Sequence, residues 1–370
     1  VARVGRCDMG AYEYTAPGPA VSIYAFSGTP QRTLPSSTFP QPLQAAVLDG
    51  IGSPVNGITV YFSAPASGAS GTFADTGTYT TTAVTNDGGI ATAAVFTANG
   101  VLGCYTVTAT VAGVLTPANF LLCNAWWYVS PSGNDGNDCQ SPASACATIG
   151  GALNKPGFAA GDTVFVASGI YGGEVVLLKD ATLSGGWDAS FTIQSGSSIV
   201  DGEGARGGIS VASGVNATIE RFTVRNGSGY EYGGGIYNSG TLTLNNSTIS
   251  GNTAKYSGGG IYNDRTGSVT LNNSTVSGNS SEYGGGIRNN GTLTVTCSMI
   301  NSNWGHKGGG IENRGWLRIS HSNVSGNVAD VGAGIHIHQS GYRGTQATII
   351  GNNILNNDSG GIWVDGEDIA

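Results

Sequence analysis

The chain has 370 residues, of which 62 are glycine and only 10% are charged, far below the ~25% usual for globular proteins. This length suggests two or three domains, and the net charge of −8 argues against nucleic acid as a partner. The sequence contains no run of about 20 apolar residues, so we expect no membrane insertion in this segment. Because it also lacks an initiator methionine and an export signal, we expect a processed or excised segment.

Residues 1–16 contain a short run with a recognisable pattern: Cys7-Asp8-Met9-Gly10-Ala11-Tyr12-Glu13-Tyr14. This run resembles the closing motif of large bacterial surface β-helix proteins of the choice-of-anchor type, where it ends a helix. The resemblance implies that residues 1–16 close a β-helix, either in the chain's own array or in a neighbouring subunit. We therefore treat residues 7–14 as a predicted assembly segment.

Residues 17–124 contain short stretches of alternating apolar and polar residues separated by glycine and proline turns. The predicted strands are 21–26, 43–48, 58–62, 91–96, 105–111 and 119–122. Strands of this length and spacing are typical of a β-sandwich.

Four segments of this region carry a family pattern: Leu43-Gln44-Ala45-Ala46-Val47-Leu48-Asp49, Pro54-Val55-Asn56-Gly57-Ile58-Thr59-Val60-Tyr61-Phe62, Thr85-Asn86-Asp87-Gly88-Gly89-Ile90-Ala91 and Tyr105-Thr106-Val107-Thr108-Ala109. They resemble the bacterial Ig-like domains of invasin-type surface proteins. The resemblance implies an Ig-like fold that acts as a spacer. Cysteines at positions 104 and 123 depart from the family pattern and imply extra stiffening.

The six cysteines favour an oxidising compartment. A hairpin centred on residues 113–114 would place Tyr105 opposite Leu122, and Cys104 then falls opposite Cys123, which predicts a disulfide. A second disulfide is predicted between Cys139 and Cys146, across a short polar loop. Cys7 and Cys297 have no evident partner, and the repeat position of Cys297 predicts a buried, inert thiol.

Residues 125–160 resemble the start of pectin-lyase-like β-helices. The residues that carry the resemblance, which extends to residue 167, are Tyr128-Val129-Ser130-Pro131-Ser132-Gly133-Asn134-Asp135, Cys146-Ala147-Thr148-Ile149 and Gly161-Asp162-Thr163-Val164-Phe165-Val166-Ala167. We expect a short helix near residues 147–153 to cap the first coil, and Trp126 and Trp127 to pack at the joint with the preceding domain. Asp135 and Asp138 are candidate calcium ligands, although their loop lacks the full EF-hand spacing and an ordinary turn is favoured.

Residues 161–370 contain a repeat built around Gly-Gly-Gly-Ile. Its isoleucines are 25, 26, 24, 24 and 27 residues apart: Ile236, Ile261, Ile287, Ile311, Ile335 and Ile362. Each repeat has about three short alternating stretches and no helical period. The pattern predicts a parallel β-helix with one coil per repeat, right-handed by the usual crossover rule.

Asparagines recur at one corner of this repeat, at Asn252, Asn279, Asn303 and Asn327. Amides stacked in this way can hydrogen-bond to the coils above and below, so we interpret them as a structural ladder. Asn-x-Ser/Thr triplets such as those at Asn246 and Asn273 could instead be glycan acceptors, but the repeat generates these triplets in any case.

One stripe of the repeat is predicted to face outward. It comprises the residues after the core isoleucines and aromatic or histidine residues just before the glycines: Tyr237, Tyr262, Arg288, Glu312, His336 and Trp363, with Tyr232, Tyr256, Tyr283 and His306. Aromatic faces one coil apart suit sugar rings or a protein partner. The plainer interpretation, which we favour, is a ladder of stacked tyrosines with an Arg288–Glu312 pair between neighbouring coils.

Catalysis on such a fold needs clustered carboxylates or acidic calcium ligands beside a basic residue. The acidic residues of the repeats occupy unlike coil positions: Asp201, Glu203, Asp264, Glu282, Glu312 and Asp330. The sequence therefore predicts no catalytic residues, no enzyme activity and no cofactor beyond the candidate calcium.

The order of these parts is the end of a β-helix, an Ig-like spacer, and the start and middle of another β-helix. The chain is then either a fragment of a giant tandem protein, or a subunit that joins copies of itself head to tail. We expect an extracellular structural or adhesive protein of the bacterial cell surface, with surface glycans as further candidate partners. The alternative is a carbohydrate-binding or polysaccharide-degrading β-helix protein.

Overall fold

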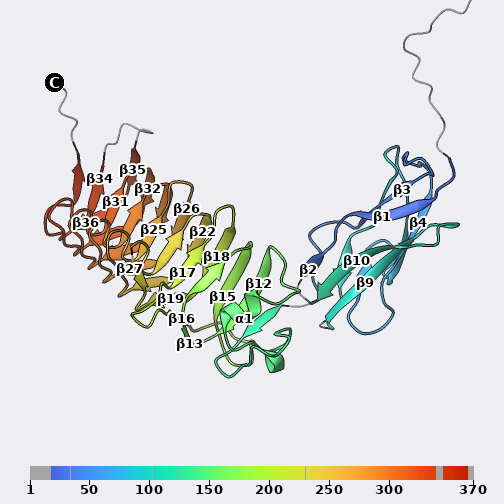
Figure 1. Ribbon diagram of the computed structural model, residues 1–370, viewed down its shortest axis with the longest axis horizontal. Helices are drawn as coiled ribbons and strands as arrows, with labels where there is room; N and C mark the ends of the chain where they lie inside the picture. The colour runs from blue at the N-terminus through green and yellow to red at the C-terminus, as the bar shows by residue number, and fades with distance from the viewer. Residues whose placement is uncertain are drawn as a thin grey trace, which may run out of the picture. The chain divides into compact units, whose positions relative to one another are not determined.

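A computed structural model describes residues 18–33, 35–101, 103–124, 126–229, 231–338 and 345–365 (Figure 1). The chain divides into two compact units, residues 1–125 and 126–370, and each has its own hydrophobic core. The predicted assembly segment, residues 7–14, lies outside the described residues.

The first unit consists of two main sheets and a strand pair. One sheet has the order β1 (Ser22–Ser27), β3 (Gln44–Leu48), β7 (Ile90–Thr92). The second has the order β2 (Gln31–Thr33), β10 (Ala118–Asn124), β9 (Gly103–Thr110), β4 (Thr59–Ser63), β6 (Thr80–Val84). The pair is β5 (Gly71–Phe73) with β8 (Phe96–Ala98). Side chains from both main sheets share one core, so this unit is a two-layer β structure.

The hairpin formed by β9 and β10 has the predicted register. Tyr105 faces Leu122, and Cys104 faces Cys123, to which it is disulfide-bonded. The single strand predicted at residues 91–96 is wrong, because β7 ends at Thr92 and pairs with β3, whereas β8 begins at Phe96 and pairs with β5. The chain crosses from one sheet to another between these two strands.

The second unit is a parallel β-helix of three long sheets (Figure 1). The β11–β35 sheet contains β11 (Trp127–Val129), β12 (Asp162–Ala167), β15 (Ala181–Trp187), β18 (Asn216–Glu220), β22 (Thr241–Asn245), β26 (Ser268–Asn272), β29 (Thr292–Thr296), β32 (Trp316–Ser320) and β35 (Gln346–Ile350). The β13–β36 sheet contains β13 (Gly169–Gly172), β16 (Ser198–Asp201), β19 (Phe222–Arg225), β23 (Thr248–Ser250), β27 (Thr275–Ser277), β30 (Met299–Asn301), β33 (Asn323–Ser325) and β36 (Asn353–Leu355).

The third sheet carries the core isoleucines. This β14–β37 sheet contains β14 (Val175–Leu177), β17 (Ile209–Val211), β21 (Ile236–Asn238), β25 (Ile261–Asn263), β28 (Ile287–Asn289), β31 (Ile311–Asn313), β34 (Ile335–Ile337) and β37 (Ile362–Val364). A short pair at one corner is formed by β20 (Ser228–Gly229) and β24 (Thr253–Ala254).

The start of the β-helix is closed by a short α-helix, α1 (Ile149–Leu153), and a 3-10 turn (Pro142–Ser144). The side chain of Thr148 caps α1 by accepting a hydrogen bond from the amide of Gly151. Trp127 is 1% exposed within the core of the β-helix itself, and its indole donates to Asp162. Trp127 therefore belongs to this core, and Trp126 packs on Phe165 of the same unit, with ring centroids 4.0 Å apart. Packing of the tryptophans at the joint with the preceding domain stays a prediction.

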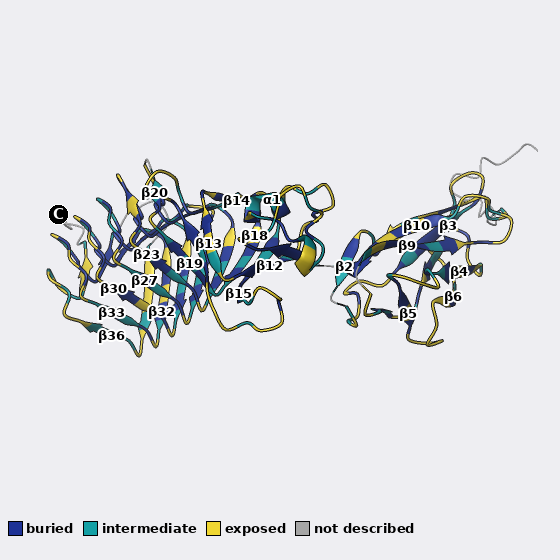
Figure 2. Ribbon diagram, turned by 90° about the horizontal axis from the view of Figure 1, so that it is seen from below, coloured by how far each residue is buried: buried dark blue, intermediate teal, exposed yellow. Residues whose placement is uncertain are grey.

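Each core isoleucine lies directly over the one in the preceding coil. Ile236, Ile261, Ile287, Ile311 and Ile335 pair in register and are 0% exposed. Buried segments, in dark blue, recur along the β-helix in Figure 2. Burying one such side chain is worth roughly 1.5–3 kcal/mol, so this column, with matching columns from the other two sheets, forms the core.

The glycine triplet before each isoleucine has two separate causes. Its first member has a positive φ, 67° at Gly258, and residues other than glycine rarely adopt such a backbone conformation. Its third member approaches the next coil so closely that a Cβ at Gly260 would lie 2.6 Å from the carbonyl oxygen of Gly286. The corner therefore bends sharply and brings the residues before the triplet next to the following strand.

The predicted asparagine ladder is present. The side chain of Asn252 donates to Asn279 at 2.9 Å, and the same bond continues through Asn303 and Asn327. A second buried ladder, which the sequence analysis does not single out, joins Asn238 to the later coils through the side chains of Asn263, Asn289 and Asn313.

Candidate functional site

The predicted stripe lies on the outer side of the β14–β37 sheet. The strand register places the residues that follow the core isoleucines in one column, one residue per coil: Tyr237, Tyr262, Arg288, Glu312, His336 and Trp363. The column exists as predicted, and its exposure differs along its length.

The middle of this column is buried. Arg288 is 7% exposed, and Glu312 and His336 are 0% exposed, whereas Trp363 in the last described coil is 51% exposed. The prediction of an outward-facing stripe is therefore wrong for these three charged or titratable residues.

The physical reason is the glycine corner, which brings the preceding segment back beside the column. The ring of Tyr232 lies 4.8 Å from that of Tyr262, and the guanidinium of Arg288 lies 5.7 Å from the ring of Tyr283. Tyr237 stacks on Tyr262 in the next coil, with centroids 5.4 Å apart and planes at 14°. Both parts of the plainer interpretation, the stacked tyrosines and the ion pair between neighbouring coils, are thus present.

Glu312 is the centre of a buried charge cluster. Its carboxylate pairs with Arg288 through Nη1 and with Arg314 through Nε at 3.2 Å, and His336 Nδ1 lies 3.9 Å away. Burial lowers the pKa of the Arg288 guanidinium, while the neighbouring Glu312 carboxylate acts in the opposite direction. Two guanidiniums around one carboxylate keep each charge partnered in a site with little access to water.

A groove of about 1110 Å³ lies above this part of the column. Its lining residues come from four successive coils: Tyr232, Tyr256, Ser257, Tyr262, Arg265, Thr266, Tyr283, Arg288, Asn290 and Arg314. The groove therefore runs along the axis of the β-helix, and its lining combines four tyrosines with three arginines and no carboxylate.

One side of the groove is made by a connection that is longer than those of the neighbouring coils on either side. The connection from Asn263 to Ser268 spans five positions, whereas the equivalent connection from Asn238 to Thr241 spans three. The two additional positions accommodate Arg265 and Thr266, which are exposed and line the groove. No other repeat of the β-helix between residues 236 and 316 has this insertion.

Hydrogen bonds fix the floor of the groove. Asn290 donates to the hydroxyl of Tyr262 at 3.0 Å and accepts from Arg288 Nε at 3.2 Å. Burial raises the pKa of Tyr262, so its hydroxyl stays neutral at physiological pH. The nearby Glu282 raises the pKa of the Tyr283 phenol, which likewise remains a neutral hydrogen-bonding group.

The groove brings together five residues of the predicted stripe, Tyr232, Tyr256, Tyr262, Tyr283 and Arg288. Glu312 lies behind it, while His336 and Trp363 belong to later coils, where His336 Nε2 is 2.9 Å from Asp365 Oδ1. Four residues of the groove were not predicted from the sequence: Arg265, Thr266, Asn290 and Arg314. The signal for the first two was present as the longer loop of this one coil.

The acidic residues of the repeats remain dispersed. Asp201 accepts from Arg225 at 2.9 Å, and Asp330 pairs with His306 at 2.8 Å on the surface. Within the described ranges no group of three or more histidine, cysteine, aspartate or glutamate side chains is placed to hold a metal ion.

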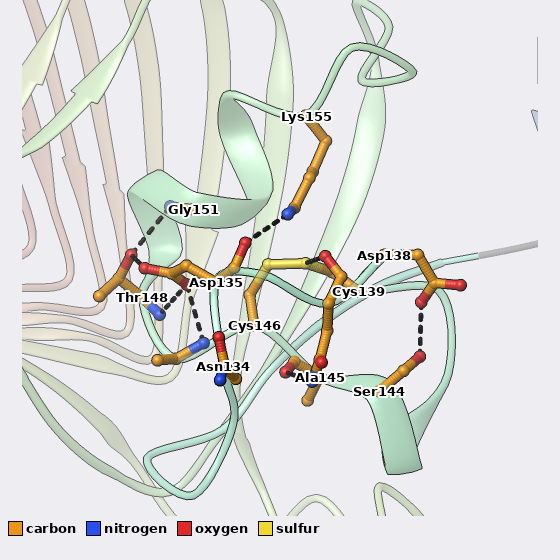
Figure 3. Close-up of a disulfide and its surroundings, with 12 residues drawn as sticks. Asn134, Asp135, Asp138, Cys139, Ser144, Ala145, Cys146, Thr148, Gly151 and Lys155 are labelled. Carbon is orange, nitrogen blue, oxygen red and sulfur yellow. Dashed lines mark hydrogen bonds between the residues drawn. A yellow bond between two sulfur atoms is a disulfide. The ribbon is translucent and has the colours of Figure 1, made fainter.

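The candidate calcium ligands Asp135 and Asp138 point in different directions (Figure 3). Asp135 accepts from the amides of Ala147 and Thr148, each at 2.9 Å, and so supports the start of α1. Asp138 accepts from the hydroxyl of Ser144 at 2.6 Å. These hydrogen bonds, together with the Cys139–Cys146 disulfide beside them, make the loop a brace for the helix cap.

Cys297 is exposed, so the prediction of a buried thiol is wrong. It occupies a corner with φ of 49°, the position held by Asn246 and Asn273 in other coils, and there the side chain points away from the core. The equivalent position in each repeat faces solvent because the core is filled by the residues that follow it.

We expect Cys297 to react with a maleimide in the native protein, whereas Cys104, Cys123, Cys139 and Cys146 should react only after reduction. The reason is that Cys297 is free and exposed while the other four are in disulfides. Peptide mapping with one label before and another after reduction checks this. Native labelling at Cys104 or Cys139 would contradict the pairing.

Comparison with a family model agrees with the fold of the second unit. Residues 207–369 match the family model of the right-handed β-helix region. The structure of pectate lyase Pel9A is similar, with a TM-score of 0.40 and 14% identity over 65% of this chain and 78% of that chain. Pectin methylesterase PemA from Erwinia chrysanthemi has a TM-score of 0.38 and 12% identity over 64% of this chain and 80% of that chain. Likenesses this distant do not extend to activity.

The comparison with curated proteins gave no match. Among the described residues, the structure contains no helix that is both long enough and apolar enough to cross a membrane.

Proposed function

We propose that this protein is an extracellular structural and adhesive component of a bacterial surface. The observation that carries the proposal is the tyrosine and arginine groove, which crosses four coils of a β-helix held by continuous asparagine ladders. A β-helix of this kind is a stiff support for an extended binding surface. The two disulfides support an oxidising compartment.

The first unit is, in this proposal, a bacterial Ig-like spacer. Two sheets sharing one core, with a disulfide across the β9–β10 hairpin, support that role. Polysaccharide degradation is not part of the proposal, because the described lining of the groove contains no carboxylate.

The proposal includes longitudinal assembly of copies of the chain. An end of a β-helix presents strand edges, which favour pairing with another chain. The occupant we propose is the segment 7–14 of a neighbouring copy, whose sequence resembles a β-helix closing motif.

We expect the full chain to form filaments in negative-stain electron microscopy, and a variant lacking residues 1–16 to sediment as a monomer. Trp363→Asp should also prevent assembly, because it places a charge on the exposed face of the last coil. The matched control is Trp316→Asp, since Trp316 is similarly exposed, 55% against 51%, but lies in β32 within the body of the helix.

Filaments from the deletion variant would overturn the closing role of residues 1–16. A full chain that stays monomeric at all concentrations tested would overturn assembly of separate copies.

A further inference from the structure

We propose that the groove binds an acidic sugar chain that lies along the axis of the β-helix. This inference deepens the adhesive part of the proposed function and rests on it. The tyrosines supply faces for sugar rings, and the arginines supply partners for carboxylate or sulfate groups.

The tyrosine faces are accessible and follow the helix axis. Tyr232 is 42% exposed and Tyr256 is 37% exposed, although they belong to successive coils and lie in a groove. Coils are stacked at about 4.8 Å, the strand spacing, so the rings form a track rather than a single platform. A track of this kind suits a chain of repeated rings better than one compact ligand.

The side chains that line the groove carry only positive charge, although the whole chain has a net charge of −8 and Asp264 and Glu282 lie close to two of the lining tyrosines. Three arginines line the groove, and the carboxylate that compensates two of them, Glu312, is fully buried behind the lining. Arg265 forms no ion pair within the described part of the chain, and Arg314 keeps 37% of its side chain exposed. Their free guanidinium edges can bind carboxylate or sulfate oxygens in pairs.

The insertion that carries Arg265 strengthens the inference. The connections of the coils before and after it, Asn238 to Thr241 and Asn289 to Thr292, are two positions shorter, and this longer loop adds a cation and a hydroxyl to the side of the groove. Asn290 and Ser257 provide further polar groups for sugar hydroxyls. No described interaction within the β-helix uses the Arg265 side chain, so a structural role does not account for it.

The test measures binding of three oligosaccharides of equal length by calorimetry: alginate, which is carboxylated, heparin, which is sulfated, and a neutral maltooligosaccharide. We expect binding of an acidic chain, at least tenfold weaker in Arg265→Ala and in Tyr256→Ala, and weaker with added salt. The matched control is Arg318→Ala, because Arg318 is exposed on β32, in a different sheet. This variant should bind the oligosaccharide as tightly as the unchanged protein does. Preference between alginate and heparin identifies the acid group.

Binding of the neutral chain alone would overturn the charge selection while leaving a glycan-binding adhesive role intact. Binding of none, or equal loss in Arg318→Ala, would overturn the inference. Filament formation is read separately, so failure of the assembly proposal is distinguishable from failure here.

Discussion

Replacing Glu312 by alanine is expected to lower the free energy of unfolding of the β-helix by about 3–5 kcal/mol. The substitution leaves Arg288, which is 7% exposed, without its carboxylate partner, and it removes one partner of Arg314 as well. An unpaired charge in this position must either remain desolvated or pull the coil open to reach water. Urea unfolding followed by tryptophan fluorescence measures the loss, and hydrogen exchange should locate it around β28 and β31.

The matched control for Glu312→Ala is Asp330→Ala. Asp330 also pairs with a neighbouring coil, through His306 at 2.8 Å, but 77% of its side chain is exposed. Exposed pairs contribute about 0–1 kcal/mol, so the free energy of unfolding of this variant should be close to that of the unchanged protein. Equal effects of the two substitutions would mean that water reaches the Glu312 cluster.

The β-helix could be predicted because its determinants repeat. An isoleucine that returns every 24 to 27 residues and an asparagine that returns with it can be stacked in only one register, and the structure has that register. The β9–β10 hairpin was predictable for a related reason, since alternation along two adjacent strands fixes which residues face each other.

The burial of the stripe could not be predicted from alternation. Alternation places Arg288, Glu312 and His336 on the outer side of a sheet, but it does not say what lies over that side. Their burial follows from the glycine corner, where a positive φ at Gly284 and close contact between backbones carry Tyr283 beside the next strand. Titratable side chains at three successive positions of one column were the available sign that they partner one another.

The groove depends on a departure from the repeat. Arg265 and Thr266 lie in a connection two positions longer than the equivalent connections of the neighbouring coils, so a search for recurring positions passes over them. Cys297 illustrates the opposite error, because its position does recur, yet a recurring position was taken as buried when it is an exposed corner with a positive φ. In a solenoid, insertions mark candidate binding surfaces and corners determine exposure.

Replacing Asn279 by alanine is expected to lower the free energy of unfolding by about 2–4 kcal/mol, because two buried backbone groups lose their partners. Its Oδ1 accepts from the amide of Asn252 at 3.0 Å, and its Nδ2 donates to the carbonyl of Ile249 at 2.9 Å. The variant also breaks the ladder between Asn252 and Asn303. Urea unfolding measures the loss, and exchange of the Asn252 amide should accelerate with it.

Asn272→Ala is the matched control, since Asn272 lies in the same coil and makes one side-chain bond, to Asn245 at 3.0 Å, on a half-exposed surface. Its loss should cost less than about 1 kcal/mol, because water can replace that bond. If Asn279→Ala unfolds like this control, or if the Asn252 amide stays protected, water fills the vacated corner and the ladder contributes little. A large loss for Asn279→Ala alone would place the stiffness of the β-helix in its buried amides as well as in its isoleucine column.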